Sequence, residues 1–428
     1  MTGDSDKRQG RIPAYVSRII ESARTLRERG AFEPPPRVVG DAISAAMAKA
    51  GTRAQGRDTR TVVMAFALAT AFIAALSLCL PYRGIDTMGY GGTIYSPTDV
   101  LDCYRLWFDL NVAPLFDNTL YNLTALKLAQ FAETHEGGMY TMVTNRAMVT
   151  AIVVICGMML AVSGLLFQTS FRNPLATPSM LGVSDGVTLG CIVFAWLGNG
   201  SISEDPVLYL LCVYGFGAAT VLVVLLLSRG ISGGARYNVF DMLLLGTVIT
   251  QLLGGVNAFV QNFVMDYGTW QLFYDVQQAT DALREPLVRQ VVVAVFVLTL
   301  LPALVLRFRL NLIAFSNDEG RMMGVRTGVL RGLALVLGAS MQLAAIASIG
   351  PVAMLSLAVP FLVRYLMPSD FRSQFLGNCL IGTALLLTCM LIQHFAVIDI
   401  ITVPVGTIVS LLIIPFFVWV VALGRGRW

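Results

Sequence analysis

The feature that most constrains this chain is a series of long stretches without a charged side chain. Nine stretches of 17 to 32 residues contain no Asp, Glu, Lys or Arg. A helix of roughly 20 apolar residues is long enough to cross a bilayer. Only 13% of the residues are charged, whereas a soluble domain contains about 25%. The sequence therefore predicts an all-α polytopic membrane protein, with spans at 61–82, 147–171, 186–203, 206–228, 242–265, 290–306, 332–363, 373–398 and 400–424.

One of these stretches is too long for a single span. The 32 residues of 332–363 measure about 48 Å as a helix, and Gly350-Pro351 interrupts them. Because proline and glycine end helices, we expect two helices here, the second of them short, which gives ten in all. Pro360, and Pro404 with Gly406 further on, are predicted as further structural breaks.

The basic residues predict the orientation of the chain. Lys and Arg accumulate on the cytoplasmic side of membrane proteins. With ten spans and both termini inside, 24 of the 30 Lys and Arg residues are cytoplasmic and 6 are outside. We therefore expect a cytoplasmic N-terminal extension at 1–60 and a transmembrane domain at 61–428, with an enlarged extracytoplasmic loop at 81–146 and a cytoplasmic loop at 307–331.

The N-terminal extension contains an amphipathic pattern. Apolar residues between Ile12 and Leu26 fall on one helical face, and Gly30 follows as a stop. Such a helix is suited to lie on the anionic inner leaflet. A helix that is solvated or packed against a partner protein accounts for the pattern equally well, so both interpretations stay open.

The sequence excludes several kinds of chemistry. None of the three lysines follows a glycine, so the chain lacks a GxxxxGK[ST] phosphate loop. It has two histidines, His135 and His394, and no HExxH motif, which leaves no candidate catalytic or metal site. We therefore predict no enzyme activity, no metal site and no cofactor bound by this chain. The predicted spans contain no carboxylate, which argues against the alternative of an ion-coupled secondary transporter of a small solute.

The segment from Gly157 to Gly190, GMMLAVSGLLFQTSFRNPLATPSMLGVSDGVTLG, carries a family resemblance. It is similar to the signature of permease subunits in type II bacterial ABC importers for iron–siderophore complexes, haem and cobalamin, which have ten helices each. Three further blocks resemble that family in the same order: NLIAFSNDEGRMMGV, IGPVAMLSLAVPFLVRYLMPSDFR and VPVGTIVSLLIIPFFVWVV. The resemblance covers residues 61 to 424.

The resemblance implies roles for two cytoplasmic segments. Asn173, Pro174 and Leu175 match the family's NPLA motif, which implies a gate that closes the pathway between two permease subunits. An ordinary proline turn is the alternative for these residues. Asp318, Glu319, Gly324 and Val325 match the loop that docks into the ATPase subunit. The two carboxylates are equally suited to cap a helix on a solvated loop.

Outside the membrane, the resemblance implies docking of a substrate-binding protein through arginines. Arg146 fits the first arginine of the family's motif before the second helix, but Val149 replaces the second arginine. Arg83 and Arg105 on the enlarged outer loop are further candidates for this charge-steered contact. Phe361 replaces a histidine of the family pattern, and Thr402 replaces an acidic residue.

Taken together, the resemblance implies the permease subunit of an ATP-driven importer in the bacterial inner membrane. It implies an iron chelate or related metal cofactor as cargo, and a second permease, identical or divergent, to complete the pathway. Two ATPase subunits would hold ATP and Mg, and an extracytoplasmic binding protein would deliver the cargo. Membrane lipid is the remaining partner, and no nucleic acid is expected.

Overall fold

The computed structural model describes residues 59–79, 136–197, 202–231, 239–278, 282–313, 327–367, 370–395 and 403–425. All the described residues belong to one compact unit, Ala50–Trp428. Within these residues every regular element is a helix, which confirms the predicted all-α class. The amphipathic pattern at 12–26 and most of the predicted outer loop lie outside the described residues.

The described elements follow the predicted apolar stretches closely. Among the described residues, seven helices are long and apolar enough to cross a membrane: α3 (Thr59–Cys79), α6 (Glu136–Phe171), α8 (Pro206–Ile231), α9 (Val239–Phe259), α11 (Pro286–Ile313), α13 (Thr327–Ile349) and α15 (Phe371–Phe395). Three shorter apolar helices lie in α7 (Val183–Leu197), α14 (Ala353–Leu366) and α16 (Val405–Arg425). Short elements complete the described chain: η2 (Pro178–Leu181), η3 (Val260–Val264), α10 (Tyr267–Gln278) and η4 (Ala282–Arg284). Each of the ten predicted helices thus has a counterpart among the described helices. That the chain crosses the membrane ten times, with both termini in the cytoplasm, remains a prediction.

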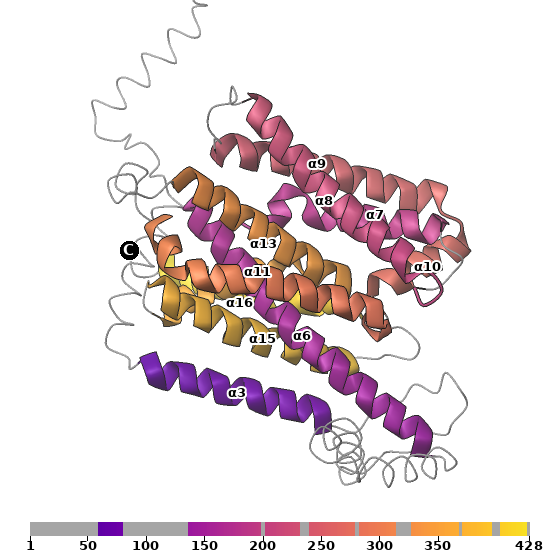
Figure 1. The fold of residues 1–428 in the computed structure, drawn as a ribbon, viewed down its shortest axis with the longest axis horizontal. Helices are drawn as coiled ribbons and strands as arrows, with labels where there is room; N and C mark the ends of the chain where they lie inside the picture. Colours follow the sequence, from indigo (N-terminus) through magenta and orange to yellow (C-terminus); the bar gives the residue numbers. More distant parts are fainter. Residues whose placement is uncertain are drawn as a thin grey trace, which may run out of the picture. The chain divides into compact units, whose positions relative to one another are not determined.

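Helix α6 is a central element, around which five other described helices pack. It contacts α3, α11, α13, α14 and α15 (Figure 1). Its apolar span, Asn145–Phe171, is 78% buried, the largest buried share among the candidate spans. The helix begins at Glu136, nine residues before that span, so the last part of the predicted outer loop is helical.

Glycines allow α6 to approach its neighbours closely. A Cβ atom on Gly157 would lie 2.8 Å from the Cα of Thr383 in α15, and the carbonyl of Ser356 in α14 occupies the place of a Cβ on Gly164. Small residues at such crossings are typical of membrane helices, because close backbone contact supplies the van der Waals attraction that holds them together.

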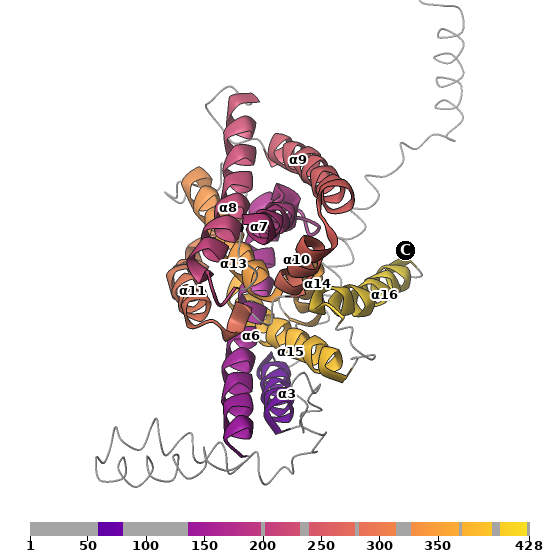
Figure 2. The same ribbon diagram turned by 90° about the vertical axis from the view of Figure 1, so that its right-hand side faces the viewer.

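A second group of helices forms beside this centre. Helix α7 lies between α8 and α9 (Figure 2). Gly186 and Gly190 of α7 face the backbone of α8 at Phe216 and Cys212, with no room for a larger side chain. Helix α7 corresponds to the predicted span at 186–203. In the structure this helix begins earlier, at Val183, and includes Asp185. Helix α7 thus has a carboxylate in its first turn, one residue before the predicted charge-free stretch.

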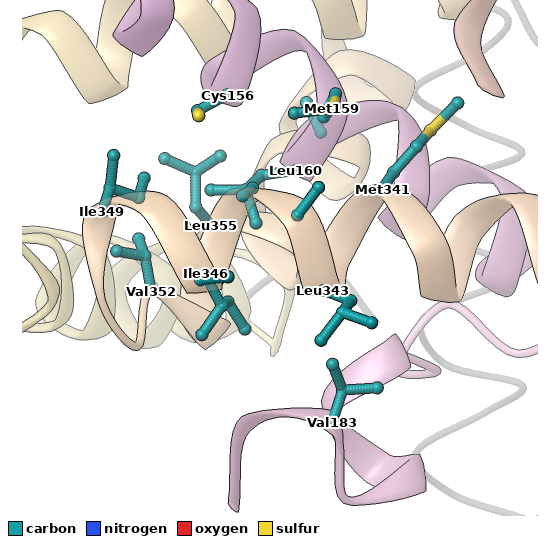
Figure 3. Packing of buried hydrophobic residues seen from close by; sticks show 14 of the residues in the cluster. Cys156, Met159, Leu160, Val183, Met341, Leu343, Ile346, Ile349, Val352 and Leu355 are labelled. Carbon is teal, nitrogen blue, oxygen red and sulfur yellow. The ribbon is translucent and has the colours of Figure 1, made fainter. Parts of the chain in front are cut away.

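The structure breaks the long apolar stretch at Gly350-Pro351. Helix α13 ends at Ile349, Gly350 has a left-handed φ of 81°, and α14 begins at Ala353. Figure 3 shows Ile349 and Val352 on either side of the break, near Leu355. The start of α16 packs against the same place, because the carbonyl of Pro351 occupies the position of a Cβ on Gly406.

The other predicted breaks differ from one another. Pro404 directly precedes α16, and its carbonyl accepts hydrogen bonds from the N–H groups of Thr407 and Ile408. Pro360 was predicted as a break, but it lies inside α14, which continues to Leu366. A proline removes only one helical hydrogen bond, and the buried packing of α14 against α6 keeps the helix continuous.

Candidate gating turn

The segment 172–182 connects α6 to α7 and contains the predicted gate residues; it is called the gating turn below. Helix α6 ends in a Schellman motif, which forms the start of the gating turn. The N–H of Asn173 donates to the carbonyl of Gln168 at 3.2 Å, and the N–H of Arg172 donates to that of Thr169 at 3.3 Å. Arg172 has a φ of 50°, a left-handed conformation that glycine usually adopts at this position. The end of α6 is therefore fixed by backbone geometry.

Asn173 and Pro174 fold the next residues back. The N–H of Ala176 donates to the carbonyl of Asn173 at 3.1 Å, which closes a β-turn with Pro174 at its second position. The side-chain Oδ1 of Asn173 accepts the N–H of Leu175 at 3.0 Å. This is an Asx turn, which uses Oδ1 of Asn173 and does not use its Nδ2 group.

The 3-10 helix η2 completes the gating turn. Pro178 stands at its start, and Thr177 and Ser179 share a hydroxyl–hydroxyl hydrogen bond at 2.8 Å. The helix ends at Gly182, whose φ of 75° is left-handed and whose N–H donates to the carbonyl of Ser179 at 2.9 Å. A Cβ atom there would also lie 2.7 Å from Cγ2 of Thr220 in α8, so glycine is required twice over.

Burial divides the gating turn into an anchored part and a presented part. Ala176, Thr177, Pro178 and Leu181 are buried, and η2 packs against α9 and α13. Asn173, Pro174 and Leu175 are half-buried. Backbone hydrogen bonds thus define both ends of the turn that carries these three residues.

Polar residues that the sequence interpretation did not single out tie α6 to its neighbours. Gln168 donates through Nε2 to the carbonyl of Leu357 in α14 at 3.1 Å. Ser163 donates to Oε1 of Gln342 in α13 at 3.0 Å. All three side chains are at most 1% exposed. The sequence signal for these contacts was a glutamine inside an apolar run, because a buried amide needs a hydrogen-bond partner.

The remaining predicted site residues are distributed differently. Arg146 lies ten residues inside α6 and is half-buried, rather than in a loop before the helix. Arg83, Arg105, Asp318, Glu319, Gly324 and Val325 lie outside the described residues. The described helices bracket the predicted coupling loop, since α11 continues to Ile313 and α13 begins at Thr327. The described residues contain no group of three or more His, Cys, Asp or Glu side chains arranged to hold a metal ion.

The described helices, seven of which are long and apolar enough to cross a membrane, define a multi-pass helical membrane protein. Residues 115–422 match the model of the FecCD transport family. The chain belongs to this family, and the resemblance of its sequence blocks is confirmed.

Several curated proteins are similar over most of this region. The hemin transport system permease protein HmuU of Yersinia pestis is 30% identical over 277 residues, which cover 63% of this chain and 79% of that protein. A probable iron chelatin transport system permease protein of Helicobacter pylori is 26% identical, over 64% of this chain and 80% of its own length. The vitamin B12 import system permease protein BtuC of Klebsiella pneumoniae is also 26% identical, over 65% of this chain and 81% of that protein.

A solved structure shares the fold. An inward-facing metal-chelate type ABC transporter matches with a TM-score of 0.62 at 19% sequence identity. The match covers 85% of this chain and 99% of that chain. This likeness concerns the fold, that is, the helical arrangement described above.

Proposed function

We propose that this chain is the permease subunit of a type II ATP-driven importer, which carries an iron chelate such as a siderophore, or a related metal cofactor, into the cell. The observation that carries the proposal is the family match over residues 115–422. The names of the similar permeases, for an iron chelate, hemin and vitamin B12, supply the cargo class. All these cargos are bulky chelates, so a wide pathway rather than a tight pocket suits them.

The proposal includes an assembly in the bacterial inner membrane. This chain and a second permease enclose the pathway, two ATPase subunits hold ATP and Mg, and an extracytoplasmic protein delivers the cargo. Ten spans with both termini in the cytoplasm place the gating turn and the coupling loop toward the ATPases. Family membership weighs against the alternative of an ion-coupled secondary transporter.

The gating turn supplies the gate in this proposal. A rigid turn that presents Asn173, Pro174 and Leu175 is suited to meet the same turn of a second permease. ATP binding moves the helices that hold it, so that the pathway closes and opens by rigid-body motion.

Two substitutions at Asn173 separate a gate from a plain turn. Asn173→Asp retains the oxygen that accepts the N–H of Leu175 but loses the Nδ2 donor, whereas Asn173→Ala loses both groups. For a gate, both variants assemble normally and hydrolyse ATP with reduced transport per ATP in reconstituted vesicles. If Asn173→Asp transports with unchanged coupling and only Asn173→Ala is impaired, the residue serves the turn alone.

The coupling role is tested by the double substitution of Asp318 and Glu319 to alanine. We expect co-purification of the ATPase and cargo uptake to be lost. The matched control is the double substitution of Glu204 and Asp205 to alanine, which removes the same charge from the turn between α7 and α8. Uptake and co-purification that survive the first substitution contradict the docking assignment.

Uptake of labelled chelates tests the cargo class. Cells with and without this chain are compared for uptake of a ferric siderophore, hemin and cobalamin. The proposal expects one of these to depend on the chain, and on ATP. Dependence on none of them contradicts the proposed cargo class.

A further inference from the structure

Helix α13 contains, near its start, an arginine that no role described above uses. Arg331 is half-buried and is the fifth residue of the helix, which begins at Thr327. Its Nε and Nη2 atoms are buried, and neither has a hydrogen-bond partner. The first turn of α13 contains no acidic side chain. A positive group therefore lies near a helix start, where the helix dipole is positive as well.

The two unpartnered nitrogens of Arg331 define a binding geometry. They lie on one edge of the guanidinium group, so their N–H bonds point in the same direction. This edge forms two parallel hydrogen bonds with two oxygens of a carboxylate or a phosphate. The last carbonyls of a neighbouring helix are alternative acceptors, but no such bond forms among the described residues. Burying charged donors without an acceptor costs stability.

The packing of α13 against α6 places this arginine beside the gating turn. The two helices lie side by side (Figure 1). Ser163 donates to Gln342, and a Cβ on Gly338 would lie 2.9 Å from the ring of Phe167. Four residues forward along α6 thus match four residues back along α13, so the helices are antiparallel. Continued at this rate, the register sets Arg331 beside the end of α6, on the same face as Gly338 and Gln342.

Arg172 brings a second positive charge to the same place. It is exposed, and it lies close enough to Arg331 for the two charges to repel each other. Its φ of 50° belongs to the left-handed region, which glycine adopts without a steric penalty. An arginine at this position therefore strains the end of α6, and strain of this kind is typical of functional sites.

Space is available next to Arg331. A Cβ on Gly328, one turn earlier, or on the adjacent Gly332 would meet nothing within 4 Å. Arg331 is also only the fourth residue of the apolar span Gly328–Ile349. This depth corresponds to the lipid headgroups, so the arginine is within reach of ligands from the aqueous phase and of anionic headgroups.

The charges select the kind of ligand. Water satisfies N–H donors but does not neutralise two guanidinium groups next to a helix start. A carboxylate supplies one negative charge, whereas a phosphate monoester or inorganic phosphate supplies about −1.5 to −2 and at least three acceptor oxygens. We propose that Arg331 and Arg172 bind a phosphate group, with two of its oxygens on the Nε and Nη2 atoms of Arg331. The ligand would link the start of the gating turn to α13.

A melting assay tests the site and distinguishes the sources of phosphate. The full chain, purified in a maltoside detergent without phosphate, is heated in sodium phosphate, sodium acetate or sodium chloride at equal ionic strength. A parallel series compares phosphatidic acid with diacylglycerol, the same lipid without its phosphate. Wild type is expected to melt at a higher temperature with sodium phosphate than with sodium chloride, or with phosphatidic acid than with diacylglycerol. The series that responds identifies a free or a lipid phosphate.

Three variants are compared in the same assay. Arg331→Lys retains the charge but loses the paired N–H groups, so its apparent affinity for phosphate is expected to fall at least about tenfold. Arg172→Gly removes the backbone strain, so it is expected to melt no lower than wild type without phosphate and yet to lose most of the phosphate effect. Arg229→Lys, at the exposed end of α8, is the matched control and retains the wild-type affinity.

Three results would overturn the proposal. The first is a wild-type melting temperature that neither phosphate source raises. The second is an Arg331→Lys variant that binds phosphate as tightly as Arg229→Lys, or an Arg172→Gly variant that retains the full phosphate effect. The third is an equal rise with sodium acetate, which would assign Arg331 to a carboxylate such as that of a partner protein.

Discussion

The contact between α6 and α15 yields a quantitative prediction for Gly157→Ala. The added Cβ would lie 2.8 Å from the Cα of Thr383 and 3.0 Å from the carbonyl oxygen of Gly382. Carbon atoms in contact are about 3.6 Å apart, so the helices must separate by about 0.8 Å. Both contacts are with backbone, which has no rotamer to yield.

Separation also weakens a hydrogen bond across the same contact. Thr383 donates through Oγ1 to the carbonyl of Val154 at 3.2 Å, the long end of the useful range. Losing this bond costs about 0.6 kcal/mol, the average between membrane helices. Overpacking costs about 1–3 kcal/mol. We therefore expect Gly157→Ala to destabilise the chain by about 1.6–3.6 kcal/mol.

The assay is unfolding of the purified chain by titration with SDS, followed through the exposure of buried thiols. Cys156, Cys191, Cys212 and Cys389 are buried, so their labelling reports loss of the helix core. Gly215→Ala is the control, because a Cβ there meets nothing within 4 Å and it makes the same change in helix propensity. Equal stability of the two variants would refute the argument that backbone contact at Gly157 requires glycine.

Two further predictions concern polar groups. Gln342→Met is expected to leave the free energy of unfolding within about 1 kcal/mol of wild type. The reason is that Nε2 of Gln342 is buried without a partner, and Ser163 retains its hydrogen bond to the carbonyl of Leu160. A loss of more than about 2 kcal/mol in the SDS titration would show that the amide is needed. Hydrogen bonds from the side chain and backbone of Thr269 lower the pKa of Asp266, so the cap that Asp266 provides for α10 is complete above its unfolded pKa of about 3.9 and is lost as the pH falls through the folded value. Hydrogen exchange of the Thr269 amide, corrected for its intrinsic pH dependence, is expected to lose protection at low pH in wild type but not in Asp266→Asn.

The candidate site shows where local rules were sufficient and where they failed. Proline sterics predicted that α6 ends near Asn173, and the described helix ends at Phe171. The same rule predicted a break at Pro360, where α14 continues because tertiary packing outweighs one missing hydrogen bond. The Schellman motif was not predictable, since its left-handed residue is Arg172 rather than glycine.

The charge-free stretch that predicted α7 begins one residue after Asp185. Charge-free stretches end at a charged side chain by definition, so Asp185 was excluded from the predicted span that begins at 186. In the structure the helix starts at Val183 and includes it. Only the neighbouring helices decide whether a charge at the end of an apolar run is solvated or faces the middle of a span.

The sequence by itself determined that this chain is helical and crosses a membrane repeatedly. Apolar stretches of this length allow no other spanning form, because every backbone polar group in hydrocarbon must be satisfied within its own helix. The tertiary structure alone decided which faces meet. Asn257 reaches Asp185 across 72 residues of chain, and Gly157 touches Thr383 across an even longer separation. Such registers depend on the shapes of two packed surfaces together, which no periodicity within one helix contains.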